Sequence, residues 1–495
     1  MHRRALGAIA AAFAIAGACS VYDEDLLVAG PDASAGGTGG GPVRNPVPES
    51  EWGSGVGWWS TKRDDGCVSA GAPLPSDRPA PGDTTQLPPI YFALTHMALG
   101  SLDRDQEATD NAWSALGLDL DGLCTTSPSC PGSASGDEQP CAPRRTIIPP
   151  DGDRCRDNVF GLLEDQAVAV PAISGTYGLS NDGFNCALCN GDYNFLFRVS
   201  GYNGQADDDQ IRIDIYPSPG LEADLAWDCT ANDEARAWRQ NACWSATDKW
   251  TVASDSLGVG TTPGDDLANA KLAVPAAYVR QGFVVALLPA DTLFWFPGAR
   301  AVTRAFPLKM QFGVVIGRLV QEDGVWRIRD GTIAGRTRTS DLIDGFRQLG
   351  FCADDPNYPT LTTLTDTYAD VLASGEIDPE AKCDALSVGI GFEAAQAAVS
   401  TTPRAVEPLP GCPSGTGGAG GQSGAGGGGG GGASGAGGGG GGASGAGGGA
   451  SGAGGGGGAS GTAGAGGGAG ASGTAGASGT AGASGTAGAS GTAGA

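Results

Sequence analysis

Histidine is nearly absent from this chain, and acidic residues far outnumber basic ones. Of 495 residues, 2 are histidine, 29 are lysine or arginine and 54 are aspartate or glutamate, which gives a formal net charge of -25. Nucleic-acid binding needs clustered lysine and arginine to neutralise phosphates, so nucleic acid is not an expected partner. Cations, a glycan or a protein surface are better candidates.

The chain also lacks any apolar run of about 18 residues, the length that a membrane-spanning helix needs. Residues 5–18 form a shorter run of small and apolar residues, which follows Arg3 and Arg4. A basic start, a short apolar stretch and small residues before a cleavage point are typical of a secretory signal. We therefore expect residues 1–18 to be a signal peptide that is removed on export.

Cys19 directly follows this segment, and residues 15–19 resemble the bacterial lipobox with Ala16 where leucine is typical. The alternative is ordinary cleavage after Ala18, which releases a soluble protein. Of the 13 cysteines, lipidating Cys19 leaves an even number for disulfides in an oxidising compartment, and this favours the lipoprotein. We expect a palmitate-bearing membrane anchor at Cys19, and Ser20 favours the outer membrane or cell surface.

Charge and glycine content divide the remaining chain into four parts. Residues 19–50 are rich in glycine and proline and are expected to be a disordered linker. Residues 51–338 are expected to form a β-rich body, and residues 339–412 a helical, disulfide-linked unit packed on it. Residues 413–495 hold half of the 88 glycines and no charged residue, which predicts a disordered tail of glycine, alanine, serine and threonine repeats.

Strand patterns dominate the body. Ile211, Ile213 and Ile215 alternate with polar residues, as in a half-buried strand, and Asp323-Gly324 is a strong hairpin signal. Many strands without intervening helices predict a mainly β fold, an antiparallel sandwich or jelly roll. Helices are expected from Leu342 to Leu349, from Thr362 to Ala373 and from Glu380 to Leu386.

Six cysteines are candidates for disulfides. Cys352 and Cys383 flank the expected helical unit and are predicted to bond to each other. Cys229 and Cys243 bracket a polar segment and are a second candidate pair. Cys186 and Cys189 have the spacing of a redox pair or half a zinc site, but the context of neither is present, so a structural disulfide or separate partners are favoured.

No residue stands out as catalytic. His96 is the single histidine beyond the signal peptide, and it lies in an apolar strand, where a structural role is favoured. The body has no Gly-x-Ser-x-Gly elbow and no Walker-type phosphate loop. The many carboxylates and 10 tryptophans, Trp58-Trp59 and Trp295 among them, leave a secreted glycan hydrolase on a β-sandwich scaffold as the alternative to a non-enzymatic protein.

Acidic clusters are the best candidates for a site. Asp119 and Asp121 precede Gly122, Asp151 and Asp153 flank Gly152, and Asp157 follows four residues later, so carboxylate oxygens lie at alternate or nearby positions. Calcium binds six to eight such oxygens, so these five aspartates are candidate Ca²⁺ ligands. No segment completes the EF-hand pattern, and solvated acidic loops are the competing interpretation.

Several segments together resemble the uncharacterised glycine-tailed lipoproteins of myxobacterial type. They are the start, the tail, residues 117–124, Asp157-Asn158 with Gly161, and residues 383–387. The resemblance implies an envelope protein and supplies no catalytic residue. The sequence thus predicts a membrane-anchored lipoprotein with a binding or structural role, with a spacer role of the tail as a further alternative.

Overall fold

The structure is a computed structural model. It describes residues 47–52, 56–63, 66–126, 139–168, 180–223, 225, 243–258, 267, 269–296, 306–406 and 411–412. The expected signal peptide, Cys19, nearly all of the linker, Cys229 and the tail lie outside these residues.

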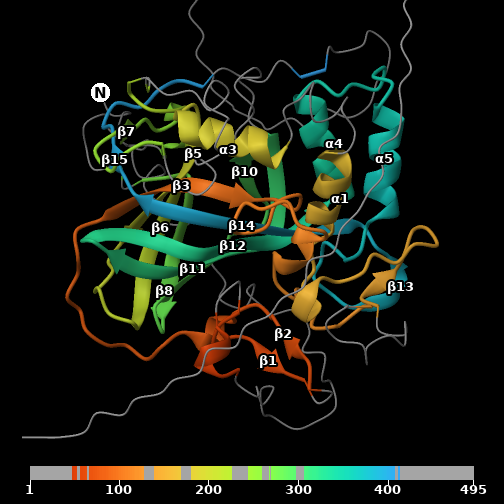
Figure 1. The fold of residues 1–495 in the computed structure, drawn as a ribbon, viewed down its shortest axis with the longest axis horizontal. Coiled ribbons are helices and arrows are strands. Elements are labelled where there is room, and N and C mark those ends of the chain that lie inside the picture. The colour runs from red at the N-terminus through yellow and green to blue at the C-terminus, as the bar shows by residue number, and fades with distance from the viewer. Residues whose placement is uncertain are drawn as a thin grey trace, which may run out of the picture. The chain divides into compact units, whose positions relative to one another are not determined.

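Eight antiparallel strands close into a barrel (Figure 1), in which each strand pairs with the next along the chain and the last pairs with the first. The barrel strands are β3 (Ile90–Ala98), β5 (Asn194–Ser200), β6 (Asp208–Ser218), β8 (Leu272–Arg280), β9 (Phe283–Leu287), β11 (Phe306–Glu322), β12 (Val325–Arg338) and β14 (Ala385–Gln396). The mainly β prediction is confirmed, but the sandwich or jelly roll is wrong. The sheet closes because β11 pairs with β12 along one edge and with β9 along the other.

The shorter elements lie between or beside the barrel strands. Four helices are described: α1 (Val159–Val168), α3 (Asn181–Asn190), α4 (Thr339–Gln348) and α5 (Tyr358–Thr367). The remaining strands are β1 (Thr61–Lys62), β2 (Val68–Ser69), β4 (Cys141–Ala142), β7 (Lys249–Trp250), β10 (Thr292–Phe296), β13 (Asp378–Lys382) and β15 (Ala398–Val399). Short 3₁₀ turns are η2 (Glu49–Glu51), η3 (Pro75–Asp77), η4 (Ala112–Ala115), η6 (Asp153–Cys155) and η9 (Ser254–Ser256). Among the described residues, no helix is both long and apolar enough to cross a membrane.

The two ends of the barrel differ. The antiparallel registers put the long connections after β3, β6, β9 and β12 at one end, whereas short turns join β8 to β9 and β11 to β12 at the other. Three helices, α1, α4 and α5, group to one side of the barrel in Figure 1. The long connections therefore bring residues far apart in sequence together at one end.

Apolar side chains fill the barrel. One buried cluster draws residues from all eight strands, Phe197, Ile213 and Phe392 among them, and must occupy the interior. A second cluster around Trp250 and a third around Trp59 pack against the outer face of a few strands each. Packing on both faces excludes water from most of the sheet and contributes the main stabilising term.

Asparagine side chains replace a neighbouring strand along the second half of β3. Strand β5 pairs with β3 only at residues 90–93. Beyond that point, the backbone N–H groups of Leu94, Met97 and Leu99 donate to side-chain oxygens, which belong to Asn194, Asn185 and Asn181 at 2.8, 2.7 and 2.6 Å. These amides satisfy backbone groups that would otherwise be buried without partners.

Two of the three expected helices are confirmed as α4 and α5, but the third is wrong. Residues 378–382 form β13, which pairs with β4, and β14 begins at Ala385. The β14 segment pairs with β12 and β3, so it closes the barrel. Pairing across the sheet overrides the helical propensity of Glu380–Leu386.

The expected cysteine pairings are wrong. Cys383 bonds to Cys141, because the pairing of β13 with β4 puts their Cα atoms 5.2 Å apart. Cys352 bonds to Cys412 instead. Cys243 bonds to Cys189, not to Cys229, and Cys186 is also disulfide-bonded. Cys186 and Cys189 thus have separate partners, as one of the sequence alternatives held.

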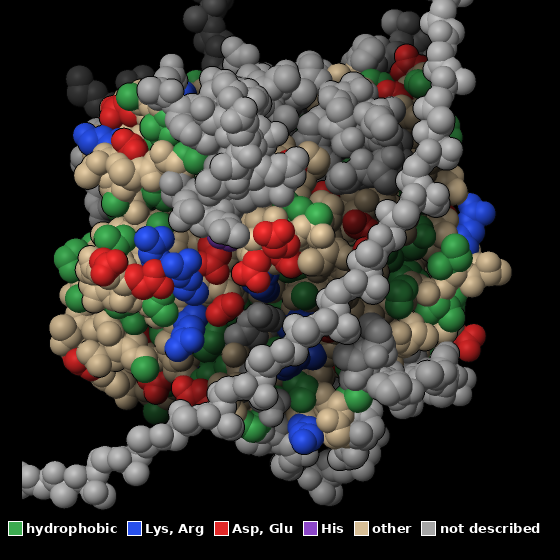
Figure 2. Space-filling view, in the orientation of Figure 1, with side chains coloured by type: hydrophobic (Ala, Val, Ile, Leu, Met, Phe, Trp, Pro, Cys, Tyr) green, Lys and Arg blue, Asp and Glu red, His purple; other side chains and the backbone are tan. Residues whose placement is uncertain are grey.

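Charged side chains of both signs mingle on the surface. On the described part of the face shown in Figure 2, lysine and arginine lie beside aspartate and glutamate. Glu322, for example, pairs with Arg327 and Arg329 at 2.9 and 2.6 Å, and Arg329 reaches Glu393 at 2.7 Å. Such exposed pairs contribute little to stability, so they do not define a site.

Candidate metal centre

Two loop segments, residues 118–125 and 151–157, run alongside each other and carry the five aspartates singled out in the sequence. Asp157 N–H donates to the Leu118 carbonyl at 2.9 Å, and Asp151 N–H donates to the Thr125 carbonyl at 2.9 Å. The Cys124–Cys155 disulfide joins the same two segments. Backbone pairing and the disulfide hold the two loops in a fixed relation.

Glycine lets the first loop lie directly on the barrel. A Cβ atom built on Gly389 of β14 would stand only 2.4 Å from the Gly117 Cα atom, and Gly117 has a φ of +91°. Asn158 fixes the second loop beside it, because its Oδ1 accepts the Gly389 N–H at 2.8 Å. The aspartates are therefore held against a buried strand and not on a free surface loop.

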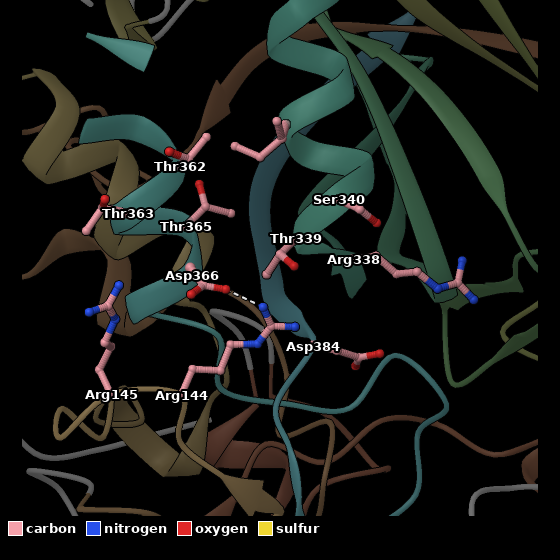
Figure 3. Close-up of a pocket in the computed structure, with 11 residues that line it drawn as sticks. Arg144, Arg145, Arg338, Thr339, Ser340, Thr362, Thr363, Thr365, Asp366 and Asp384 are labelled. Atoms are coloured by element: carbon pink, nitrogen blue, oxygen red, sulfur yellow. Dashed lines mark hydrogen bonds and ion pairs between the residues drawn. The ribbon is translucent and has the colours of Figure 1, made fainter. Parts of the chain in front are cut away.

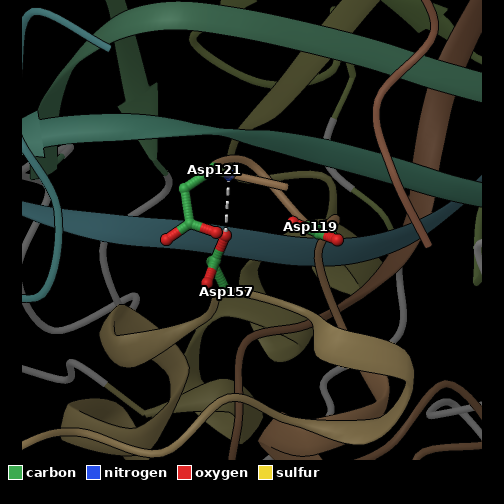
Figure 4. A group of neighbouring side chains, drawn as sticks. All are labelled: Asp119, Asp121 and Asp157. Carbon is green, nitrogen blue, oxygen red and sulfur yellow. Dashed lines mark hydrogen bonds between the residues drawn. The ribbon is translucent and has the colours of Figure 1, made fainter. Parts of the chain in front are cut away.

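Four carboxylates converge on one small cavity. Ligand oxygens of Asp119, Asp121 and Asp157 lie within 4.8 Å of one another, and Figure 4 shows the carboxylates of Asp121 and Asp157 pointing toward each other. A cavity of about 20 Å³ is lined by Asp121, Asp151, Asp157 and Asp370. Since one water needs roughly 10–15 Å³, the cavity has room for a single ion or water.

Backbone N–H groups orient these carboxylates. Leu120 N–H donates to Asp157 Oδ2 at 2.6 Å, and Thr125 N–H donates to Asp151 Oδ2 at 2.5 Å. Asp157 and Asp151 are 3% and 7% exposed. Among the described residues, the hydrogen bonds to these two carboxylates are made at Oδ2, so Oδ1 of each is left for another ligand.

Asp119 is held differently from the others. Its Oδ2 accepts the Ser69 hydroxyl at 2.5 Å, and its Oδ1 accepts the Gly122 N–H at 2.7 Å. With both oxygens in hydrogen bonds, Asp119 shapes the loop more than it offers a free ligand. Asp121 and Asp370 are partly buried, and each accepts a backbone N–H at 2.8 Å, from Leu123 and Ser387.

Burial raises the pKa of five clustered carboxyls, those of Asp119, Asp121, Asp151, Asp157 and Asp370. Loss of hydration and, to a smaller extent, the negative charge of Asp121 raise the pKa of Asp119 to about 8 and that of Asp370 to about 7. Asp151 and Asp157 have pKa values well above the ordinary range for the same two reasons, and burial also raises the pKa of Asp121. The group therefore needs protons or a cation to be stable.

The protein supplies only part of the compensating charge. Arg336 of β12 is 6% exposed, and its guanidinium donates to the Leu120 carbonyl at 2.6 Å. Its charge acts on Asp121, Asp157 and Asp370, but no ion pair joins it to any of the five aspartates among the residues described. The charge of Arg63 also lowers the pKa of Asp119 and Asp121, but two arginines cannot neutralise five carboxylates.

The donor set fits a hard divalent cation. It consists of carboxylate oxygens, and the nearby cysteines Cys141 and Cys383 are in a disulfide, so they offer no thiolate. Zinc and copper favour nitrogen and sulfur ligands, whereas calcium favours six to eight oxygens. Magnesium usually keeps several waters, for which about 20 Å³ leaves no room. The residues fit Ca²⁺ best.

The sequence identified most of this centre. It singled out Asp119, Asp121, Asp151 and Asp157, which the structure brings together. Asp153 lies outside the cavity lining, and its carboxylate accepts the Ser114 hydroxyl at 3.4 Å. Asp370 was missed, because it enters from the connection between α5 and β14 and no acidic pattern surrounds it in the sequence.

His96 has the features of a structural histidine. It is 7% exposed, and its Nδ1 lies 3.3 Å from the Thr95 hydroxyl. Burial lowers its pKa to about 4, so the ring is neutral at physiological pH. A buried base with this pKa is poorly suited to proton transfer near neutral pH.

The glycan-hydrolase alternative gains no support from the aromatic residues. Trp58 and Trp59 are 9% and 1% exposed and pack in an apolar cluster. Trp295 lines a cavity of about 350 Å³ that also contains Asp255 and Asp291. Hydrogen bonds from Gln311 and Lys309 lower the pKa of Asp291 to about 2, so it cannot act as a general acid near neutral pH.

Comparison with known proteins adds no functional assignment to this geometry. No family model matches the chain, and neither a curated protein nor a solved structure is similar to it.

Proposed function

We propose that this chain is an exported envelope lipoprotein, anchored through Cys19, whose barrel has a non-enzymatic binding or structural role and is stabilised by one bound Ca²⁺. The observation that carries the calcium part is the cavity of about 20 Å³ lined by Asp121, Asp151, Asp157 and Asp370. A cation there removes the electrostatic cost of grouping buried carboxylates.

Calcium binding is tested by titration of the metal-free protein. We expect one Ca²⁺ per chain by isothermal calorimetry, and thermal unfolding that shifts to higher temperature with added Ca²⁺. At a free concentration about 100 times Kd, a ligand that binds only the folded state stabilises it by about 2.7 kcal/mol. An unchanged Tm after chelation would refute the proposal, and equal stabilisation by Mg²⁺ would refute calcium as the cation.

Matched aspartate variants locate the site. Asp157→Asn removes a cavity-lining charge and should weaken Ca²⁺ binding at least tenfold. Asp153→Asn, four residues away and outside the cavity lining, should leave it unchanged. Equal loss in both variants would contradict the assignment, because it would indicate a diffuse effect of negative charge.

Export and anchoring are supported by the disulfides and by the start of the sequence. Four disulfides are described, which join Cys124 to Cys155, Cys141 to Cys383, Cys189 to Cys243 and Cys352 to Cys412. Stable disulfides form mainly in oxidising compartments outside the cytosol. Metabolic labelling with a palmitate analogue should mark the wild type and not Cys19→Ser. Equal labelling of the two would refute the anchor.

A further inference from the structure

One wall of the proposed calcium cavity is a single segment, residues 139–149, which we call the strap. The strap contains no acidic residue. It nevertheless provides six of the residues that line the cavity, which are Gln139, Pro140, Cys141, Pro143, Ile148 and Pro149. The lining carboxylates come from Asp121, Asp151, Asp157 and Asp370 instead. The strap therefore covers the carboxylates without adding one.

The composition of the strap and the size of the cavity restrict how a bound ion can leave. Three of the strap residues in the lining are prolines and a fourth is Ile148, so most of this wall offers no side-chain ligand to an ion or to water. An ion leaves a cavity of carboxylates as water oxygens replace them, and a volume of about 20 Å³ has no room for both the ion and a water. Release then requires the wall to open. The strap is the largest part of the wall that can move without displacing a carboxylate.

A disulfide holds the strap beside one of the carboxylates. Cys141 bonds to Cys383, which lies just before β14, and both cysteines are 2% exposed. The Cys141 Sγ atom lies 3.3 Å from the backbone carbonyl oxygen of Asp370, a residue that lines the cavity. The backbone adds the short pairing of β4 with β13, next to which the Cys383 N–H donates to the Ala142 carbonyl at 3.0 Å. The disulfide thus fixes the strap against the segment that carries Asp370.

Arg144 is a second connection between the strap and the rest of the chain. Its guanidinium pairs with Asp366 of α5, as Figure 3 shows, and its Nε donates to the Cys383 carbonyl at 2.5 Å. The next residue, Arg145, is exposed and lies apart from this ion pair in Figure 3. It makes no ion pair with the described residues. One of two adjacent arginines therefore holds the strap, and the other provides a matched control.

We propose that the strap controls the exchange of the bound Ca²⁺, and that the Cys141–Cys383 disulfide and Arg144 hold the strap closed. This inference rests on the calcium centre proposed above. The ion leaves slowly because the strap opens before water can replace the carboxylates. A slowly exchanging ion keeps the barrel stabilised when the Ca²⁺ concentration outside the cell falls for a short time.

The rate of Ca²⁺ release tests the role of Arg144. The full chain, loaded with Ca²⁺, is mixed in a stopped-flow instrument with an excess of a fluorescent chelator, and the rate constant of release is measured. Arg144→Gln should release Ca²⁺ about tenfold faster than the wild type, because the strap loses one charged hydrogen-bonding group. Arg145→Gln removes the same charge one residue away and should release it at the wild-type rate. Equal rates in the two variants would overturn the proposal.

Two double variants, each lacking one disulfide, test the covalent connection. Cys141→Ser with Cys383→Ser should release Ca²⁺ faster than Arg144→Gln does. Cys352→Ser with Cys412→Ser removes a disulfide outside the cavity lining and should release it at the wild-type rate. Equal acceleration in both would indicate a general loss of stability and would contradict the strap.

Calorimetry of the wild type distinguishes failure of this inference from failure of the calcium centre. If the wild type binds no Ca²⁺, the calcium centre itself is refuted. If the wild type binds Ca²⁺ and the variants release it at the wild-type rate, the strap alone is refuted. Should the variant that lacks the Cys141–Cys383 disulfide not fold, the two arginine variants still decide, because both keep every disulfide.

Discussion

The asparagine side chains along β3 bond to its backbone in place of a neighbouring strand, and removing one of them tests how much this contributes to stability. Asn185 of α3 accepts the Met97 N–H at 2.7 Å, and its Nδ2 donates to the Met97 carbonyl at 2.8 Å and to Gln106 Oε1 at 2.5 Å. It is 1% exposed. A single side chain thus makes both hydrogen bonds that a neighbouring strand would make to Met97.

Asn185→Ala removes these bonds and leaves one backbone group buried without a partner. The Met97 carbonyl keeps two donors, from Asn181 at 2.9 Å and Gln106 at 3.0 Å, but the Met97 N–H loses its acceptor. An unsatisfied buried donor costs about 1–3 kcal/mol, and each lost neutral hydrogen bond costs about 1 kcal/mol. We expect the free energy of unfolding to fall by about 2–4 kcal/mol.

Urea unfolding with disulfides intact measures this difference. Asn185→Asp is a second test variant. It keeps an acceptor for the Met97 N–H but places a carboxylate beside two oxygen acceptors, the Met97 carbonyl and Gln106 Oε1, so it should lower the free energy of unfolding at least as much as Asn185→Ala. Asn357→Ala is the control, since that side chain makes no hydrogen bond to the described residues and should change stability by less than about 0.5 kcal/mol. If Asn185→Ala costs no more than this control, the amide does not replace a strand.

Three further predictions follow from the same structure. Between pH 6.5 and 4 the unfolded state takes up a proton at His96 that the folded state refuses, so this residue should contribute a loss of about 3 kcal/mol of stability as pH falls. The difference between the wild type and His96→Gln in urea titrations at each pH measures this contribution. Gly389→Ala should weaken Ca²⁺ binding at least tenfold by calorimetry, because the added Cβ would displace the Gly117 loop. Gly82→Ala is the control and should leave Ca²⁺ binding unchanged, because its Cβ would meet nothing closer than 4.0 Å. Peptide mapping without reduction should recover Cys352 joined to Cys412, and a peptide joining Cys352 to Cys383 would contradict the fold. Cys412→Ser should lower the free energy of unfolding by about 4 kcal/mol, because the unfolded chain then loses the constraint of a 60-residue loop.

Strand positions were largely readable from the sequence, because the side-chain pattern of a strand is local. The alternation at Ile211, Ile213 and Ile215 predicted a strand, and all three are buried in the barrel interior. Asp323-Gly324 predicted the turn between β11 and β12, and Asp323 and Gly324 both have positive φ.

Closure of the sheet could not be read in the same way. A sandwich and a barrel present similar alternation along each strand, and they differ in which distant strands pair. Here the barrel closes because β9 pairs with residues 314–318 in the middle of β11, while β10 pairs with residues 306–310 along the same edge of β11. The length of β11 permits both pairings, but no local pattern specifies them. The cysteine pairings failed for the same reason, since they depend on tertiary contacts.

The acidic centre was predictable only in part, because some of its residues form a local sequence pattern and Asp370 joins them only through tertiary contacts. Asp119 and Asp121 form a local pattern with Gly122, and such patterns can be found in sequence because a short loop sets their geometry. Asp370 lies more than 200 positions away and reaches the cavity only because Ser387 N–H holds its carboxylate and the Cys141–Cys383 disulfide closes the wall behind it. If the proposed Ca²⁺ needs this distant ligand, Asp370→Asn should weaken Ca²⁺ binding as much as Asp157→Asn. An unchanged affinity in Asp370→Asn would instead confine the metal to the two local loops.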